Sequence, residues 1–165
     1  MLFILSIFIA NAAELEQWAQ GNFYCQSTVE EVEKERQKAM EETLQASNIV
    51  IRTLAEPKLQ GQPHICKGYQ IKTVENIMHI TCDDLPTIAI KLDGTPTQYP
   101  NDDGSGFNII ADVQNTKIVQ DFQGANGGIV VTYQFSEGKL FVTKKINSAY
   151  LGKALTVSIG YEKRE

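Results

Sequence analysis

The stretch GGIVVTYQFSEGKLFVTKKI, residues 127–146, decides the fold because apolar and polar side chains alternate through both of its halves. An alternation with a period of two is typical of a β-strand with one buried face. The sequence therefore predicts a β-hairpin that turns one face toward a core. The apolar face is formed by Ile129, Val131, Tyr133, Phe135, Leu140 and Val142.

Two turns are compatible with this hairpin. A two-residue turn of Glu137 and Gly138 sets Phe135 opposite Leu140 and so matches the apolar faces, although it puts a glutamate at positive φ. A three-residue turn that adds the preceding serine needs only Gly138 at positive φ but sets Phe135 opposite Lys139. We favour the two-residue turn, and the other stays open.

The rest of the C-terminal half repeats the same alternation. Further strands are expected at 107–113, around 118–122 and at 155–161, and no helical stretch separates them. Such a pattern favours an antiparallel meander over a parallel sheet. The predicted fold class is α+β, with one N-terminal helix packed on a curved antiparallel meander of eight or nine strands that forms a half-barrel or a barrel-like sheet.

The single helix is expected at residues 29–46, which contain neither Gly nor Pro. Ser27 and Glu30 have the spacing of a capping box at its start. Residues 48–54, NIVIRTL, either prolong this helix or open the first strand, and their β-branched side chains favour the strand. Residues 55–63 contain two prolines and a glycine and are expected to form a loop.

The N-terminus reads as a signal peptide. Residues 1–12 carry no charge and close on Ala10-Asn11-Ala12, a small-x-small cleavage pattern, and the run is too short to span a membrane. No Lys or Arg precedes the apolar run, so a retained N-terminal anchor is the alternative. We expect residues 13–165 to form a single α+β domain that is secreted or periplasmic.

Charge and composition exclude some partners. The formal net charge is −5, and the basic residues are interspersed with acids. A surface that binds nucleic acid needs clustered Lys and Arg. We therefore expect no nucleic-acid partner and, once the signal peptide is cleaved, no membrane partner.

Three cysteines remain in the predicted mature chain. Cys66 and Cys82 fall in neighbouring strand-like runs, and a loop at 73–75 sets them opposite each other, with Tyr69 opposite His79. We expect these two cysteines to form a disulfide in an oxidising compartment. Pairing of Cys25 with either of them is the rival.

Residues suited to catalysis are few, and the chain is not expected to be an enzyme or to need a cofactor. His64 and Cys66 lie two apart, but a zinc site needs three or four ligands and the sequence names no other. The carboxylates of Asp102 and Asp103 with Asn101 offer oxygen ligands for calcium, but a plain turn explains them better. No metal is expected.

Two functions remain. The architecture resembles exported cystatin-like and lipocalin-like folds, a resemblance that implies binding. The first function is an exported protein that binds another protein, as an inhibitor or an immunity factor, through loops 95–106 and 123–128. The alternative is a carrier of a small apolar ligand in a lipocalin-like or half-barrel cavity. The candidate binding residues are Gln98 with Tyr99, Asn101, Asp102 and Asp103 for the loops, and Tyr133, Phe135, Phe141 and Tyr161 for a cavity.

Overall fold

The computed structural model describes residues 17–60, 62–100, 106–124 and 127–164. Within these ranges the chain forms two helices, α2 (Val29–Gln45) and α3 (Ile49–Leu59), and ten strands. The strands are β1 (Gly21–Cys25), β2 (Gly68–Val74), β3 (Ile77–Cys82), β4 (Ile88–Lys91), β5 (Thr97–Pro100), β6 (Gly106–Gln114), β7 (Lys117–Gly124), β8 (Gly127–Ser136), β9 (Lys139–Ser148) and β10 (Leu155–Arg164). The predicted signal peptide, 1–12, lies outside the described residues.

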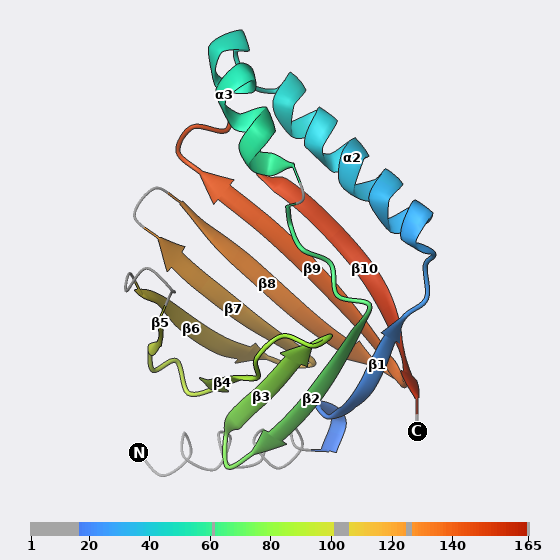
Figure 1. The fold of residues 1–165 in the computed structure, drawn as a ribbon. Helices are drawn as coiled ribbons and strands as arrows, with labels where there is room; N and C mark the ends of the chain where they lie inside the picture. Colours follow the sequence, from blue (N-terminus) through green and yellow to red (C-terminus); the bar gives the residue numbers. More distant parts are fainter. Residues whose placement is uncertain (1–16, 61, 101–105, 125–126, 165) are drawn as a thin grey trace.

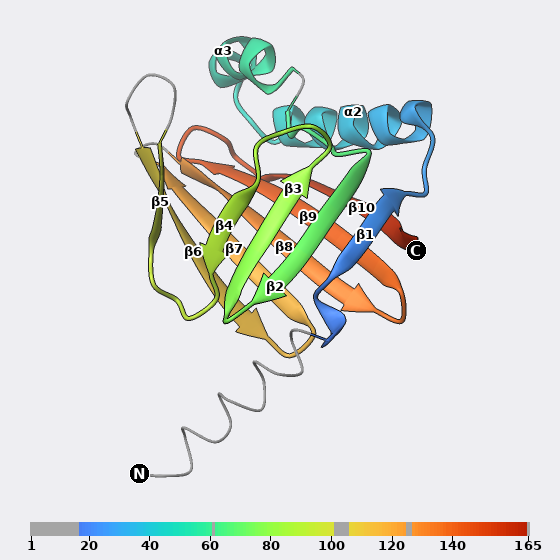
Figure 2. The same ribbon diagram turned by 60° about the horizontal axis from the view of Figure 1, so that its bottom comes forward.

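All ten strands form one antiparallel sheet in the order β4-β3-β2-β1-β10-β9-β8-β7-β6-β5. The order follows the chain except at β1, which lies between β2 and β10 and joins the two halves of the meander. The two ends of the sheet approach each other: Gly94, which follows edge strand β4, donates its N–H to the carbonyl oxygen of Ala111 on β6, the neighbour of edge strand β5, at 3.1 Å. Figure 2 shows β2–β4 crossing in front of β7–β9, with both helices at one end.

The α+β fold class with a barrel-like antiparallel meander is confirmed, with small differences in the number of elements. There are ten strands because residues 21–25 and 97–100 also pair into the sheet. The hairpin of β8 and β9 has the favoured register, with Phe135 opposite Leu140. Its two turn residues, Glu137 and Gly138, have φ values of 38° and 78°. Matching the apolar faces thus outweighs the cost of placing a glutamate in the left-handed region.

The helix begins at residue 29, as expected, but its capping box lies one residue later than predicted. Thr28 is its N-cap: the Thr28 hydroxyl accepts the Glu31 N–H at 3.2 Å, and the Glu31 carboxylate accepts the Thr28 N–H at 2.9 Å. The capping box is therefore formed by Thr28 and Glu31 and not by Ser27 and Glu30. The predicted bounds of the helix, 29–46, agree with those of α2 to within one residue at the C-terminal end.

The strand favoured at 48–54 is wrong, and the loop predicted at 55–63 is wrong as far as residue 59, because residues 49–59 form α3. Asn48 caps the helix by accepting the Ile51 N–H at 3.0 Å. Pro57 lies in its last turn, where only a short part of the helix is affected by the missing N–H. Leu59 packs with Leu44 of α2 and Leu155 of β10 in a small apolar cluster. This contact and the cap outweigh the β propensity of the segment.

The side chains on the inner face of the barrel pack together into one apolar core. At the end away from the helices, Trp18 lies against Phe135 with ring centroids 5.1 Å apart, and Phe23 contacts the same ring at 5.8 Å. The rings of Trp18 and Phe23, which precede α2, therefore pack against the hairpin of β8 and β9. Among the residues described, no helix is both long and apolar enough to cross a membrane.

Candidate functional site

Four of the polar side chains on the inner face of the barrel come from four different strands. Tyr69 comes from β2, Gln120 from β7, Lys144 from β9 and Tyr161 from β10. Tyr69, Gln120 and Tyr161 are at most 3% exposed, and Lys144 is half-buried. Each lies on the inner face because it shares the strand phase of its buried neighbours two residues away. We refer to these four residues as the interior polar group.

The chain between α3 and β2 crosses this interior. In Figure 1 residues 62–67, which we call the connector, descend from α3 in front of β9 and β10 to the start of β2. Pro63 and Cys66 of the connector are buried. Where it meets the inner face of β9 and β10 the remaining void is only about 10 Å³. The void is lined by Pro63, Ile65, Val142, Lys144, Val157, Ile159 and Tyr161.

The connector is held by the interior polar group. The Tyr161 hydroxyl donates a hydrogen bond to the backbone carbonyl oxygen of Cys66 at 2.9 Å. The Lys144 ammonium donates one to the carbonyl oxygen of His64 and lies 4.0 Å from the Cys66 sulfur. Backbone oxygens of the connector thus accept the hydrogen bonds of the two interior donors that project from β9 and β10.

The predicted disulfide between Cys66 and Cys82 is present, with a Cα–Cα distance of 5.4 Å, and Cys25 is a free thiol. The register on which the pairing was predicted is wrong. Tyr69, and not Cys66, lies opposite Cys82, because the turn between β2 and β3 is formed by Glu75 and Asn76 at positive φ. Cys66 precedes β2, so the disulfide fastens the connector to the end of β3.

Two members of the interior polar group lack partners. The Tyr69 hydroxyl and both amide atoms of Gln120 are buried without a hydrogen bond to any described residue. A buried polar group without a partner costs about 1–3 kcal/mol. The Tyr69 ring packs edge-on against Tyr133, with ring centroids 5.9 Å apart, and against Tyr161, at 5.0 Å. The interior is therefore well packed around polar groups whose hydrogen-bonding capacity is unused.

Burial determines the protonation of these groups. It lowers the pKa of Lys144 from 10.5 to about 8, although the negative charge of Asp83 acts in the opposite direction. Burial also raises the pKa of Tyr69 and of Tyr161 above the ordinary value of 10.0. At neutral pH the interior accordingly presents an ammonium and phenol hydroxyls, all of them hydrogen-bond donors.

The structure places the candidate residues in different regions. Tyr133, Phe135 and Tyr161 point into the core. Phe141 lies on the outer face and is 41% exposed, so it does not line the interior; it alternates with Leu140 and Val142, which do. Beside Gln98, Tyr99 stacks on Phe107 at 5.4 Å. Asn101, Asp102 and Asp103, with positions 125–126 of the other loop, lie outside the described residues.

Sequence reasoning missed the interior positions of Lys144 and Gln120. Both carry a signal, because each polar residue falls in the apolar phase of its strand: Lys144 two positions after Val142, and Gln120 two positions after Ile118. A polar residue in this phase is either buried or at the end of the core.

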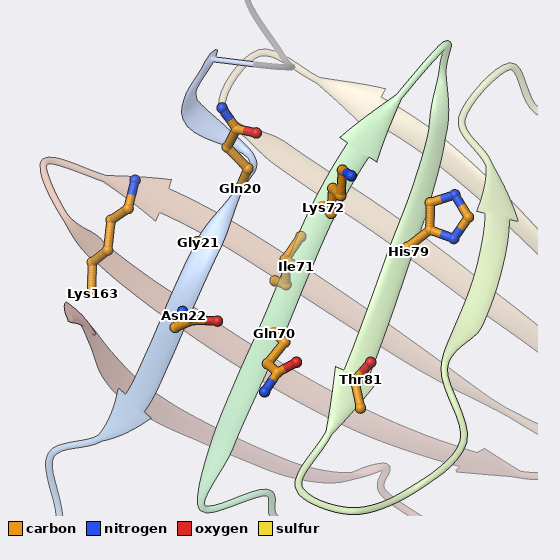
Figure 3. Close-up of a pocket in the computed structure, with 9 residues that line it drawn as sticks. All are labelled: Gln20, Gly21, Asn22, Gln70, Ile71, Lys72, His79, Thr81 and Lys163. Atoms are coloured by element: carbon orange, nitrogen blue, oxygen red, sulfur yellow. The ribbon is translucent and has the colours of Figure 1, made fainter. Parts of the chain in front are cut away.

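The larger hollows lie outside the core. One of about 490 Å³ runs over the outer face of β1–β3, where Figure 3 shows Asn22 on β1, Gln70 and Lys72 on β2, and His79 and Thr81 on β3. Another, of about 560 Å³, opens at the end where Trp18 meets Phe135. The outer hollow is lined mainly by polar side chains, whereas the one beside Trp18 reaches the aromatic residues of the core.

The geometry defines a class of fold. The barrel of ten antiparallel strands, with two helices inserted between β1 and β2, matches folds like that of the fatty-acid-binding proteins. No known protein family model matches the chain, and no curated protein matches it either.

Solved structures with this fold are similar to it in shape and distant in sequence. The fatty acid transporter REP1-NXSQ has a TM-score of 0.53 at 14% identity, with 88% of this chain and 96% of that chain covered. Zebrafish ileal bile acid-binding protein complexed with cholic acid has 0.54 at 13%, covering 88% and 98%. A secretory abundant heat soluble protein from Ramazzottius varieornatus has 0.57 at 11%, covering 88% and 94%. Two of these three names describe carriers or binders of small apolar molecules, and none describes an inhibitor or an immunity factor.

Proposed function

We propose that this chain is a carrier of a small apolar ligand whose anionic head group is bound inside the barrel by Lys144 and Tyr161. The proposal extends to this chain the kind of ligand that two similar structures carry in their names, a fatty acid and a bile acid. At such low identity those names give only a class of ligand. The charge of the head group and its position are argued from the residues of the interior.

The observation that carries the proposal is the pair of buried, unpartnered polar residues. Neither the Tyr69 hydroxyl nor the Gln120 amide has a hydrogen-bond partner within the described chain. A core that served stability alone would be better filled by apolar side chains of the same size. A ligand head group with oxygen atoms can accept hydrogen bonds from both residues. Polar groups placed sparsely in an apolar interior are the usual composition of a ligand site.

The charge of the head group follows from Lys144 and the phenols. The ammonium is the one cationic group among the four interior polar residues, and the tyrosine hydroxyls stay protonated because burial raises the pKa of Tyr69 and Tyr161. Donors of this kind bind a carboxylate or a sulfonate better than a neutral head group. The apolar part of the ligand would then lie among the aliphatic and aromatic side chains of the core.

The described structure represents a closed state. A void of about 10 Å³ is far below the roughly 300 Å³ that a ligand pocket needs. The connector fills the position, and the carbonyl oxygens of His64 and Cys66 accept the hydrogen bonds of Lys144 and Tyr161. A bound head group would take over these hydrogen bonds, so ligand binding requires the connector to move away from β9 and β10.

Equilibrium titration with a fluorescent fatty acid, in the oxidised and in the reduced protein, tests the proposal. We expect saturable binding of one equivalent, and weaker binding of the neutral methyl ester of the same probe. Lys144→Met should weaken binding of the acid about 10- to 100-fold, the value of a hydrogen bond to a charged group. Lys145→Met, on the outer face of the same strand, is the matched control and should bind as the wild type does. Absence of saturable binding in both redox states would overturn the proposal.

A further inference from the structure

Three side chains with atoms that bind soft metal ions meet where the connector reaches β3. The ligand atoms of His64, Cys66 and Cys82 lie within 4.8 Å of one another. Cys66 is 1% exposed, whereas the His64 side chain is 60% exposed, so the imidazole is free to turn toward the sulfurs. His64 and Cys66 alone provide too few ligands for a metal site, and the fold adds Cys82 as the third.

A carboxylate lies beside this cluster in a fixed position. Asp83 accepts the N–H of Lys67 at 3.1 Å and the N–H of Gly68 at 2.9 Å, one with each carboxylate oxygen. The same carboxylate lies 3.8 Å from His64 Nε2. A carboxylate in this place can orient a metal-bound imidazole or complete the coordination.

The two sulfurs bind a metal only after the disulfide is reduced, because a disulfide offers no thiolate. A dithiol reductant supplies what the step needs: its two thiols become a disulfide, and two electrons and two protons convert the Cys66–Cys82 bond into two thiols. A zinc ion then displaces the two thiol protons to solvent and forms two Zn–S bonds.

We propose that the reduced protein binds one zinc ion through Cys66, Cys82 and His64. Two thiolates and an imidazole are a ligand set that zinc favours, with the Asp83 carboxylate or a water molecule as the fourth ligand. In a tetrahedral site with Zn–S distances near 2.3 Å, the two sulfurs lie about 3.7 Å apart. Rotation of the two cysteine side chains can place the reduced sulfurs at this separation.

The site has a consequence for the connector. Cys66 belongs to the connector and Cys82 to the end of β3, so the metal would fasten the same two segments that the disulfide fastens. The protein would then have a second way to hold the connector in place under conditions that break the disulfide. This inference does not depend on the nature of the apolar ligand, and it stands even if the barrel carries none.

Titration of the full chain with Co²⁺, in the absence of any apolar ligand, tests the site. Protein reduced with a phosphine and freed of the reductant should bind one equivalent and develop the absorption of a cobalt–thiolate complex, which Zn²⁺ should abolish by displacement. The oxidised protein should show no such absorption. Absence of the absorption in the reduced wild type, or the same absorption in the oxidised protein, would overturn the proposal without the use of any variant.

Variants identify the ligands. Cys82→Ser should lose the thiolate absorption of the wild type, and His64→Ala should weaken Co²⁺ binding at least about tenfold. Cys25→Ser and His79→Ala are matched controls, because these residues lie outside the cluster. Both controls should titrate as the wild type does. Equal weakening by His64→Ala and His79→Ala, or loss of the absorption in Cys25→Ser, would contradict the assignment of the ligands.

Discussion

The hydroxyl of Tyr161, on the last strand, donates a hydrogen bond of 2.9 Å to the backbone carbonyl oxygen of Cys66, 95 residues earlier in the chain. This bond ties the connector to the inner face of β10, and the disulfide to Cys82 ties it to β3. The connector is thus attached on both sides of the barrel. A third attachment is the hydrogen bond from the Lys144 ammonium to the carbonyl oxygen of His64; under the proposed function, these attachments keep the interior closed.

Release of the disulfide should favour the open state. Reduction, or the double substitution Cys66→Ser and Cys82→Ser, removes a cross-link over 16 residues and should increase the affinity for a fluorescent fatty acid several-fold, because a larger fraction of molecules is competent to bind. Measurements need a metal chelator, so that the thiols stay free. Cys25→Ser is the control and should leave the affinity unchanged. Equal affinities of the oxidised and reduced forms would show that the connector does not gate the interior.

Gln120→Leu should separate stability from binding. The substitution removes two buried polar atoms that lack partners among the described residues, and it should raise the free energy of unfolding by about 1 kcal/mol. It should also weaken the binding of the fatty-acid probe. Gln134→Leu, at an exposed position of β8, should change stability by less than about 0.5 kcal/mol. Urea unfolding measures the free energy of unfolding of both variants. Destabilisation by Gln120→Leu would contradict the claim that the Gln120 amide has no hydrogen-bond partner.

The turn between β8 and β9 should respond to its backbone conformation. Glu137 has a φ of 38°, and Glu137→Asn should stabilise the protein by roughly 1 kcal/mol because asparagine tolerates this region. Gly138→Ala should destabilise the protein by a similar amount. A Cβ at this position meets no atom within 4 Å, so the cost comes from backbone strain at a φ of 78° alone. Thermal unfolding measures both. No gain from Glu137→Asn would argue against the two-residue turn.

Stability should depend on pH through Lys144 and the buried tyrosines. The folded pKa of Lys144 is about 8 and the unfolded value 10.5, so between these values the unfolded chain binds more protons and stability rises with pH. The raised pKa of Tyr133 reverses this trend above its ordinary value of 10.0, where the unfolded chain loses phenol protons first. Urea unfolding across this range should show the rise and the later fall. Lys144→Met should abolish the rise and leave the fall; persistence of the rise would assign it to another group.

How far the sequence predicts this molecule depends on the range of the interactions involved. The register of β8 and β9 is predictable because two apolar faces match across a short turn. The pairing of Cys66 with Cys82 is also predictable, but its register is not, because Cys66 lies before β2 and the rules for facing strand residues do not apply to it. The helical conformation of residues 49–59 depends on a cap at Asn48 and on packing against distant strands, which local β propensity does not report.

The interior site is less predictable for the same reason. The phase of β9 places Lys144 on the inner face, but the hydrogen bond of its ammonium goes to the carbonyl oxygen of His64, 80 residues away. Its burial therefore follows from the path of the connector, which no local pattern encodes. The proposed metal site likewise needs Cys82 beside His64, a proximity that only the fold provides.

The pH dependence of ligand binding tests most directly whether Lys144 binds the ligand head group inside the barrel. The affinity of the wild type for a fluorescent fatty acid should fall about tenfold or more as the pH rises through the Lys144 pKa of about 8. The loss follows because the neutral amine no longer attracts the carboxylate. Lys144→Met should bind weakly with little dependence on pH, and Lys145→Met should follow the wild type. Equal decline in the wild type and in Lys144→Met, or tight binding by Lys144→Met at neutral pH, would contradict a head group held by this lysine.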